Sequence, residues 1–119
     1  MAQEFVYEDF LEYELICRLH FIGPEFKGRQ APCFSNYRGQ FFYHYNDEGT
    51  DWLARYIFSE EPVKPGATVL AKITLAGRVL DLAKERGMPC GEQMAIREGA
   101  RIVAIGVIEE SKFDYKNRA

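Results

Sequence analysis

At 119 residues, the chain has the length of one domain and no room for a second hydrophobic core. Hydrophobic residues make up 47% of it and charged residues 28%, as in an ordinary globular domain. The formal net charge of −3 argues against a protein whose whole surface binds nucleic acid, although a local basic patch is compatible with it.

Three cysteines with no CxxC pair are typical of reduced thiols in a cytosolic protein. The N-terminus, MAQEFVYEDF, is acidic and aromatic and lacks the basic and apolar regions of a leader, so we expect no signal peptide. The apolar runs are too short to span a membrane. We therefore expect a cytoplasmic protein that does not contact membranes.

Short strands separated by turns are predicted for most of the chain. Residues 14–22 alternate, with Leu15, Cys17, Leu19 and Phe21 on one face, which is the period of a half-buried strand. Similar patterns predict five further strands, over residues 38–45, 52–58, 68–75, 93–97 and 101–108. Six short strands indicate a sandwich or a barrel, and six close most easily as a barrel.

Two segments depart from the strand pattern. Residues 78–86 place Val79, Leu82 and Ala83 at helical spacing, and Gly87 is a suitable residue to end a helix. Residues 5–13 fit either a helix or a strand, and we expect a short helix. The predicted organisation is an N-terminal extension over residues 1–12, a barrel over 13–112 and a frayed polar tail over 113–119.

Few residues suggest chemistry. His44 with Asp47 and Asp51 could form a metal site, but a solvated histidine at a strand end is favoured. Cys33 with His44 could act as nucleophile and base, but a buried cysteine under a loop is favoured. The sequence has no phosphate-binding GxxxxGK motif. We expect no enzyme, no metal, no cofactor and no bound nucleotide.

One cluster of cations stands out. Three basic residues lie within residues 27–38, and the turn at 97–101 adds two more. Guanidinium groups could contact phosphates there, next to a glycine that lets the backbone approach. The alternative is a set of surface ion pairs, such as Arg38 or Arg101 with Glu98, and the pattern alone favours the ion pairs.

Three motifs resemble a known family. Residues 28–43, GRQAPCFSNYRGQFFY, resemble the start of the third domain of elongation factor Tu, GRxTPxFxxYRPQFYF. Residues 63–69 are similar to its V-x-PGD-x-V connection, and residues 94–108 are similar to its closing hairpin, FAIREGGRTVGAGVV. The resemblance covers about residues 13–109. It implies a six-stranded antiparallel closed β-barrel, here with one short inserted helix.

The chain also departs from the family pattern. Gly39 stands where the family has proline, and Gln30 and Ala31 replace its histidine and threonine. The segment 78–91 is longer than the family's loop. These 119 residues contain no counterpart of the factor's GTPase domain or second barrel, so the resemblance does not carry GTP hydrolysis over to this chain.

The resemblance nevertheless implies a binding surface. In the family, this barrel contacts the T-stem backbone of aminoacyl-tRNA, the nucleotide-exchange factor and the factor's own GTPase domain. The family's tRNA-contacting positions correspond to Arg38, Gln40, Glu98 and Gly99, which keep the family's residue types, and Arg29 and Arg101 flank them. Arg29 and Arg101 could equally pair with carboxylates to hold the barrel together.

We therefore expect a stand-alone, non-catalytic protein-interaction module linked to translation. Its partner would be an elongation factor, the exchange factor or a second copy of the chain. The alternative is a module that binds tRNA weakly through phosphate contacts, with strong dependence on salt. A domain that folds without any dedicated partner is the third hypothesis.

Overall fold

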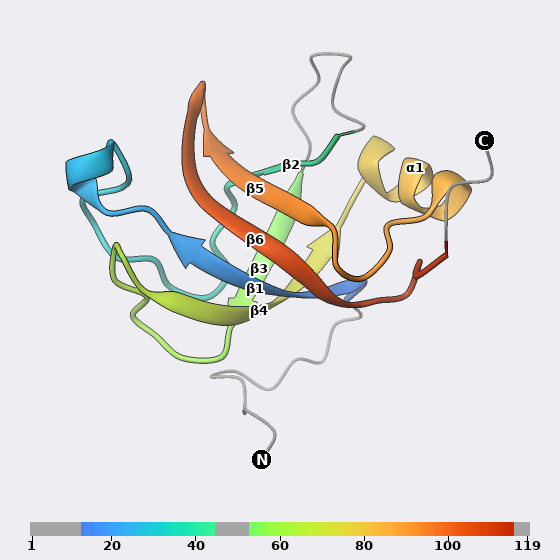
Figure 1. Cartoon of the computed structure of the whole chain (residues 1–119), viewed down its shortest axis with the longest axis horizontal. Helices are drawn as coiled ribbons and strands as arrows, with labels where there is room; N and C mark the ends of the chain where they lie inside the picture. Colours follow the sequence, from blue (N-terminus) through green and yellow to red (C-terminus); the bar gives the residue numbers. More distant parts are fainter. Residues whose placement is uncertain (1–12, 45–52, 116–119) are drawn as a thin grey trace.

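The computed structural model describes residues 13–44 and 53–115, which form six antiparallel strands and one α-helix, confirming the all-β class (Figure 1). The strands are β1 (Leu15–Phe21), β2 (Gln40–Phe42), β3 (Ala54–Phe58), β4 (Thr68–Leu75), β5 (Gln93–Glu98) and β6 (Arg101–Ser111). The helix is α1 (Arg78–Arg86), and a short 3-10 turn, η1 (Pro24–Phe26), follows β1.

The strands form one curled sheet in the order β2-β5-β6-β1-β4-β3 (Figure 1). Within the described residues, no ladder joins the two edge strands β2 and β3 to each other. Their ends are linked by a single antiparallel bridge between Tyr37, just before β2, and Tyr56 of β3. The described strands therefore form a curled half-barrel, with one bridge between the Tyr37 segment and β3, and closure into a full barrel is not shown.

The predicted elements match the structure most closely where the pattern is strict. Helix α1 and strand β4 have the expected bounds, whereas β2 spans three residues where eight were expected, over residues 38–45. Strand β6 continues to Ser111, beyond the expected end at 108. The helix expected over residues 5–13 lies outside the described residues except for Tyr13, which is not helical.

The core lies on the concave face of the sheet and includes the inward residues of every strand. Leu15, Cys17, Leu19 and Phe21 are all at most 2% exposed, as the alternation of β1 predicts. Helix α1 adds Val79, Leu82 and Ala83 to the same cluster. A nine-residue helix is marginal alone, so this burial is what stabilises it.

A tight turn follows β1. The amide of Phe26 donates to the carbonyl of Gly23 at 3.0 Å, and the amide of Gly28 donates to the same carbonyl at 3.0 Å. Lys27 takes a left-handed conformation with φ of 68°. Gly28 passes so close to the carbonyl oxygen of Ile22 that a β-carbon there would collide with it.

The C-terminal residues hold α1 against the sheet. The carbonyl of Phe113 accepts a hydrogen bond from Met88 N at 2.7 Å, and Oδ1 of Asp114 accepts one from Cys90 N at 2.9 Å. The Tyr115 hydroxyl donates to the carbonyl of Ala83 at 3.2 Å. The first three residues of the expected tail, 113–115, thus form an ordered strap across the end of α1.

The turn after β1 generates a stability prediction. Replacing Gly28 with alanine should lower the free energy of unfolding by more than about 2 kcal/mol, because the new methyl group meets backbone that cannot move aside. The matched control is Gly91→Ala, where φ is +91° and space is open, so only the left-handed backbone cost of about 1–2 kcal/mol applies. Urea denaturation of both variants measures the difference, and equal losses would contradict the collision.

Candidate functional site

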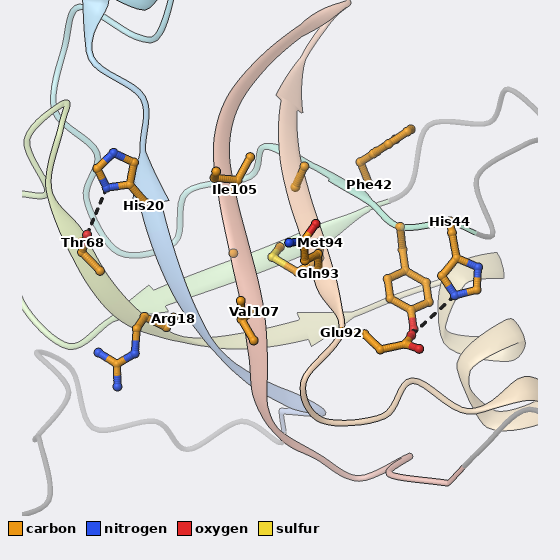
Figure 2. A pocket seen from close by; sticks show the side chains of 13 residues that line it. Arg18, His20, Phe42, His44, Thr68, Glu92, Gln93, Met94, Ile105 and Val107 are labelled. Atoms are coloured by element: carbon orange, nitrogen blue, oxygen red, sulfur yellow. Dashed lines mark hydrogen bonds and ion pairs between the residues drawn. The ribbon is translucent and has the colours of Figure 1, made fainter.

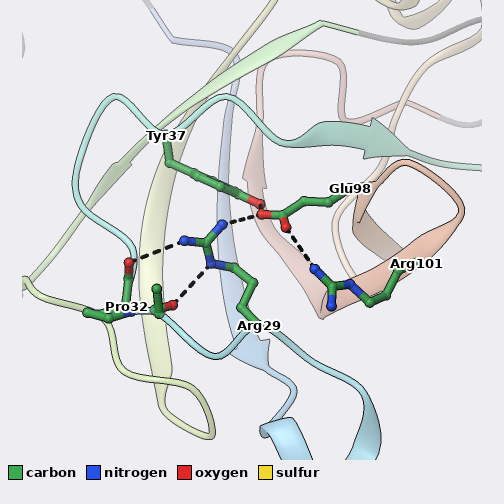
Figure 3. A network of polar contacts seen from close by, with 6 residues as sticks. Arg29, Pro32, Tyr37, Glu98 and Arg101 are labelled. Atoms are coloured by element: carbon green, nitrogen blue, oxygen red, sulfur yellow. Dashed lines mark hydrogen bonds and ion pairs between the residues drawn. The ribbon is translucent and has the colours of Figure 1, made fainter.

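Two arginines of the predicted cation cluster, Arg29 and Arg101, belong to a network centred on the Glu98 carboxylate (Figure 3). Arg29 donates through Nη1 to Oε2 of Glu98, and the Tyr37 hydroxyl donates to the same oxygen at 2.5 Å. Arg101 donates through Nη2 to Oε1 at 3.3 Å. One carboxylate therefore joins the loop before β2 to the hairpin of β5 and β6.

Arg29 is held on every side. Its Nε donates to the carbonyl of Ala31 at 3.1 Å and its Nη2 to that of Pro32 at 3.4 Å. The guanidinium also lies 5.3 Å from the centroid of the Tyr37 ring. These contacts use the guanidinium for structure, which is the ion-pair alternative considered for Arg29 from the sequence.

The electrostatics of the network favour an ionised Glu98. Burial on its own opposes the charge, but hydrogen bonds from Tyr37 and Arg29 outweigh it and lower the pKa of Glu98 below its ordinary value. Burial and the bond to Glu98 both raise the pKa of Tyr37 far above its ordinary range. The hydroxyl thus remains a donor while the carboxylate remains an acceptor.

The structure separates the other predicted site residues. Arg38 is exposed, just before β2, and no ion pair with another described residue holds it. Gly99 is exposed in the two-residue turn between β5 and β6, with φ of +64°, as a glycine at the first position of a tight hairpin allows. Of the six predicted residues, Arg38 and Gly99 therefore remain outside the network, with Gln40.

Gln40 lies directly opposite Arg97 in the pairing of β2 with β5. The Oε1 atom of Gln40 and the Nε atom of Arg97 are both buried, and neither has a hydrogen-bond partner. The Arg97 guanidinium lies 4.8 Å from the centroid of the Phe42 ring. Arg97, counted from the sequence only as a cation of the turn, is thus positioned on the sheet surface beside a predicted site residue.

A second site, absent from the sequence predictions, lies on the outer face of the sheet (Figure 2). It is a groove of about 730 Å³, called here the outer groove. Its lining comes from β1, β2, β4, β5, β6 and the residues next to them: Arg18, His20, Phe42, Tyr43, His44, Thr68, Glu92, Gln93, Met94, Ala95, Ile105, Gly106 and Val107.

The strand register explains the shape of the outer groove. Phe42, Ala95, Ile105, His20 and Thr68 are successive neighbours across five strands, in that order. Small Ala95 stands between the larger Phe42 and Ile105, so the row is low at its second position. Ile105 is 52% exposed and Val107 39%, which leaves two β-branched side chains facing solvent on the same strand.

Polar side chains form the ends of the outer groove. His20 shares a hydrogen bond of 3.0 Å with the Thr68 hydroxyl, and Arg18 pairs with Glu109 at 3.0 Å. At the other end, Nε2 of His44 lies 3.5 Å from Glu92, whose carboxylate also accepts a hydrogen bond from Tyr43. The groove therefore has an apolar middle between polar ends.

A sequence signal for this groove exists in β6. Residues 101–111 contain RIVAIGVI, in which apolar residues occupy both alternating faces. One face packs into the core through Ala104 and Ile108, and the other presents Ile105 and Val107. A central strand with apolar side chains on both faces is stable when both faces are covered. Among the described residues, only the core face of β6 is covered.

The geometry of the Cys33–His44 pair does not support the nucleophile-and-base alternative. Cys33 is 2% exposed and pairs with Val63, and burial raises the pKa of its thiol to about 11, the opposite of an activated nucleophile. His44 contacts Glu92, not Cys33. Asp47 and Asp51, the other candidate ligands beside His44, lie outside the described residues.

No protein-family model matches the chain. Within residues 13–44 and 53–115, no group of three or more histidine, cysteine or acidic side chains is arranged to hold a metal ion. Helix α1, the one α-helix in that part of the chain, is too short and too polar to cross a membrane.

The Glu98 network generates a prediction about pH. Because the pKa of Glu98 is lower folded than unfolded, its contribution is complete above the unfolded value of about 4.5 and is lost as the pH falls through the folded value. Glu98→Gln should lower stability by about 1.5–3 kcal/mol at pH 7 and by less at pH 3. Denaturation at both pH values measures this.

Arg101→Ala is the control, because its side chain is 49% exposed and an exposed ion pair contributes under about 1 kcal/mol. A Glu98→Gln variant as stable as the parent at pH 7, or equally destabilised at both pH values, would contradict the role of the carboxylate.

Proposed function

We propose that the chain is a non-catalytic protein-interaction module of the elongation factor Tu third-domain type, which binds a translation component in the cytoplasm through the outer groove. The observation that carries the proposal is the exposure of Ile105 and Val107 in the middle of that groove. Apolar patches of this kind on a small protein mark surfaces that another protein covers.

The chemistry of the groove favours a protein partner. Its middle is apolar and its ends offer hydrogen-bonding groups, which is the anatomy of a protein interface with a dry centre and a polar rim. Covering the exposed parts of Ile105 and Val107 would contribute about 2 kcal/mol. That is the scale of one binding hot spot, so neighbouring residues such as Phe42 must contribute to the affinity as well.

The resemblance also implies that the six strands close into a barrel, and the Tyr37–Tyr56 bridge supports this part of the proposal. Closure would fix β2 relative to β3 and hold Phe42 in place at one side of the outer groove. The surface that a partner meets would then be rigid already, so the protein would lose little conformational entropy on binding.

This function can be tested with defined partners. Purified elongation factor Tu and its exchange factor are titrated separately into the protein by calorimetry. Ile105→Asp should weaken binding at least tenfold, because a charge would face the apolar surface of the partner. Phe26→Asp is the matched control, since Phe26 is 74% exposed but lies outside the groove, and it should bind as the parent does.

The proposal fails if neither factor binds the parent protein, or if Ile105→Asp binds as tightly as the parent. Circular dichroism establishes that each variant is folded, which a substitution at a half-exposed position should permit.

Binding of tRNA is the second candidate, and the observation that favours it is Arg38. Its guanidinium is exposed close to Gln40 in sequence, and no ion pair with another described residue occupies it. Arg29 and Arg101 contribute less to such a surface, because both are engaged with Glu98. Of the three arginines on this candidate surface, two are engaged with Glu98, so binding through phosphate contacts would be weak and strongly dependent on salt.

The RNA candidate is tested by titrating bulk tRNA at low and at physiological salt. Arg38→Glu should lower the affinity and reduce the slope of log K against log salt by about 1, the effect of one lost phosphate contact. Lys84→Glu, an equal charge change on the exposed side of α1, is the control. Identical salt slopes for both variants, or no binding at low salt, would exclude the candidate.

A further inference from the structure

We propose that Arg97 selects the partner of the outer groove by binding a carboxylate of an acidic protein segment. This inference rests on the proposed function in taking a protein as the occupant, and it adds the chemistry by which that protein is recognised. The carboxylate belongs to an aspartate or a glutamate that has apolar residues beside it. The side chains that would bind this segment lie on β2, β5 and β6.

Arg97 lies at the edge of the outer groove. Its guanidinium is 4.8 Å from the centroid of the Phe42 ring, and Phe42 lines the groove. The strand register explains this contact, because Arg97 is two residues along β5 from Ala95, the direct neighbour of Phe42. Diagonal neighbours of this kind are within reach of long side chains. A segment that follows the groove past Phe42 therefore meets Arg97.

The positive charge of Arg97 is available to a partner. Within residues 13–44 and 53–115, no carboxylate forms an ion pair with it. The adjacent Glu98 is engaged in its own network, and Arg18, the arginine that lines the groove, is paired with Glu109. A guanidinium stacked on a ring still directs its N–H groups outward in its own plane, where a carboxylate can accept from them.

Two buried polar atoms next to each other on this surface also lack partners. Nε of Arg97 can only donate a hydrogen bond and Oε1 of Gln40 can only accept one, yet these directly opposed side chains do not bond to each other or to any other described residue. Buried groups of this kind cost free energy until a partner satisfies them. An acidic peptide segment can satisfy both, because its carboxylate accepts from Arg97 and a backbone N–H donates to Gln40.

Apolar side chains flank Arg97 on the side of β6. Arg97 is paired with Ile102 just after the register shift between β5 and β6, and directly paired residues share one face of the sheet. Ile102 is 41% exposed and Ile105 is 52% exposed. The surface thus combines an available cation with exposed aliphatic side chains, which fits an acidic residue that has apolar neighbours.

An RNA backbone fits this surface less well. A phosphate group offers acceptors only, so it would leave Oε1 of Gln40 without a donor. One face of the Phe42 ring is covered by the guanidinium of Arg97, and a base cannot stack on that face. Exposed Ile102 and Ile105 are better covered by apolar side chains than by a charged backbone. These contacts favour a protein segment as the occupant.

The test uses the full chain, isotope-labelled at the arginine Nε atoms and the isoleucine methyl groups, and two capped peptides, acetyl-Leu-Glu-Leu-amide and acetyl-Leu-Gln-Leu-amide. In titrations followed by NMR at neutral pH, the glutamate peptide should shift the Nε–H signal of Arg97 and the methyl signals of Ile102 and Ile105, with a dissociation constant of about 1 mM. The glutamine peptide has nearly the same shape without the charge, and it should bind about tenfold more weakly.

Variants assign the preference to one side chain. Arg97→Gln should bind the two peptides equally, whereas Arg97→Lys keeps the charge without the planar guanidinium and should retain part of the preference. Lys84→Gln is the matched control, since it removes one positive charge from the exposed side of α1, and it should prefer the glutamate peptide as the parent does. The comparison of the two peptides on the parent protein needs no variant to fold.

Equal binding of the two peptides by the parent protein, or no shift of the Arg97 signal by either, would overturn the proposal. Inorganic phosphate that shifts this signal as strongly as the glutamate peptide would overturn it as well, because the site would then bind anions of any kind. The proposed function is judged separately. A preference for the glutamate peptide in a protein that binds neither translation factor supports this inference and removes the proposed function, whereas factor binding that Arg97→Gln leaves unchanged does the reverse.

Discussion

The arrangement of this protein depends on one carboxylate. Glu98 stands at the end of β5 and accepts hydrogen bonds from Arg29, Tyr37 and Arg101, so it ties the long connection between β1 and β2 to the closing hairpin. Tyr37 also bridges to β3 at Tyr56. Through this chain of contacts, one partly buried acid connects both edges of the curled sheet. A neutral side chain at 98 would leave two guanidiniums without their shared partner.

The sequence pattern correctly predicted those strands and the helix that bury only one of their faces. The alternation in β1 and β4 and the spacing of Val79, Leu82 and Ala83 each report directly on burial. Strand β2 was overestimated, because RGQFFYHY has high β propensity throughout, yet only its three residues from Gln40 to Phe42 form a ladder. Propensity favours extended backbone, but pairing requires a neighbouring strand in register.

The sequence predicted which residues of the candidate site lie near one another, but it did not predict which of them contact each other. Sequence placed Arg29, Glu98 and Arg101 in one cluster, yet it could not decide that Arg29 serves the network while Arg38 faces solvent, since that depends on loop geometry. The outer groove was missed for a different reason. The residues that line it come from five strands. Strand pairing makes them neighbours, although they are far apart in the sequence.

The position of β1 has a consequence for synthesis on the ribosome. This first strand lies between β4 and β6, and its pairing with β6 joins residues about ninety positions apart, such as Arg18 and Val107. In a nascent chain, the edge of β1 that pairs with β6 therefore stays unpaired until β6 has emerged. Such late closure slows folding and lengthens the time during which a strand edge can pair with another chain. With this strand order, the unpaired edge of β1 must be kept from pairing with other chains until β6 is complete.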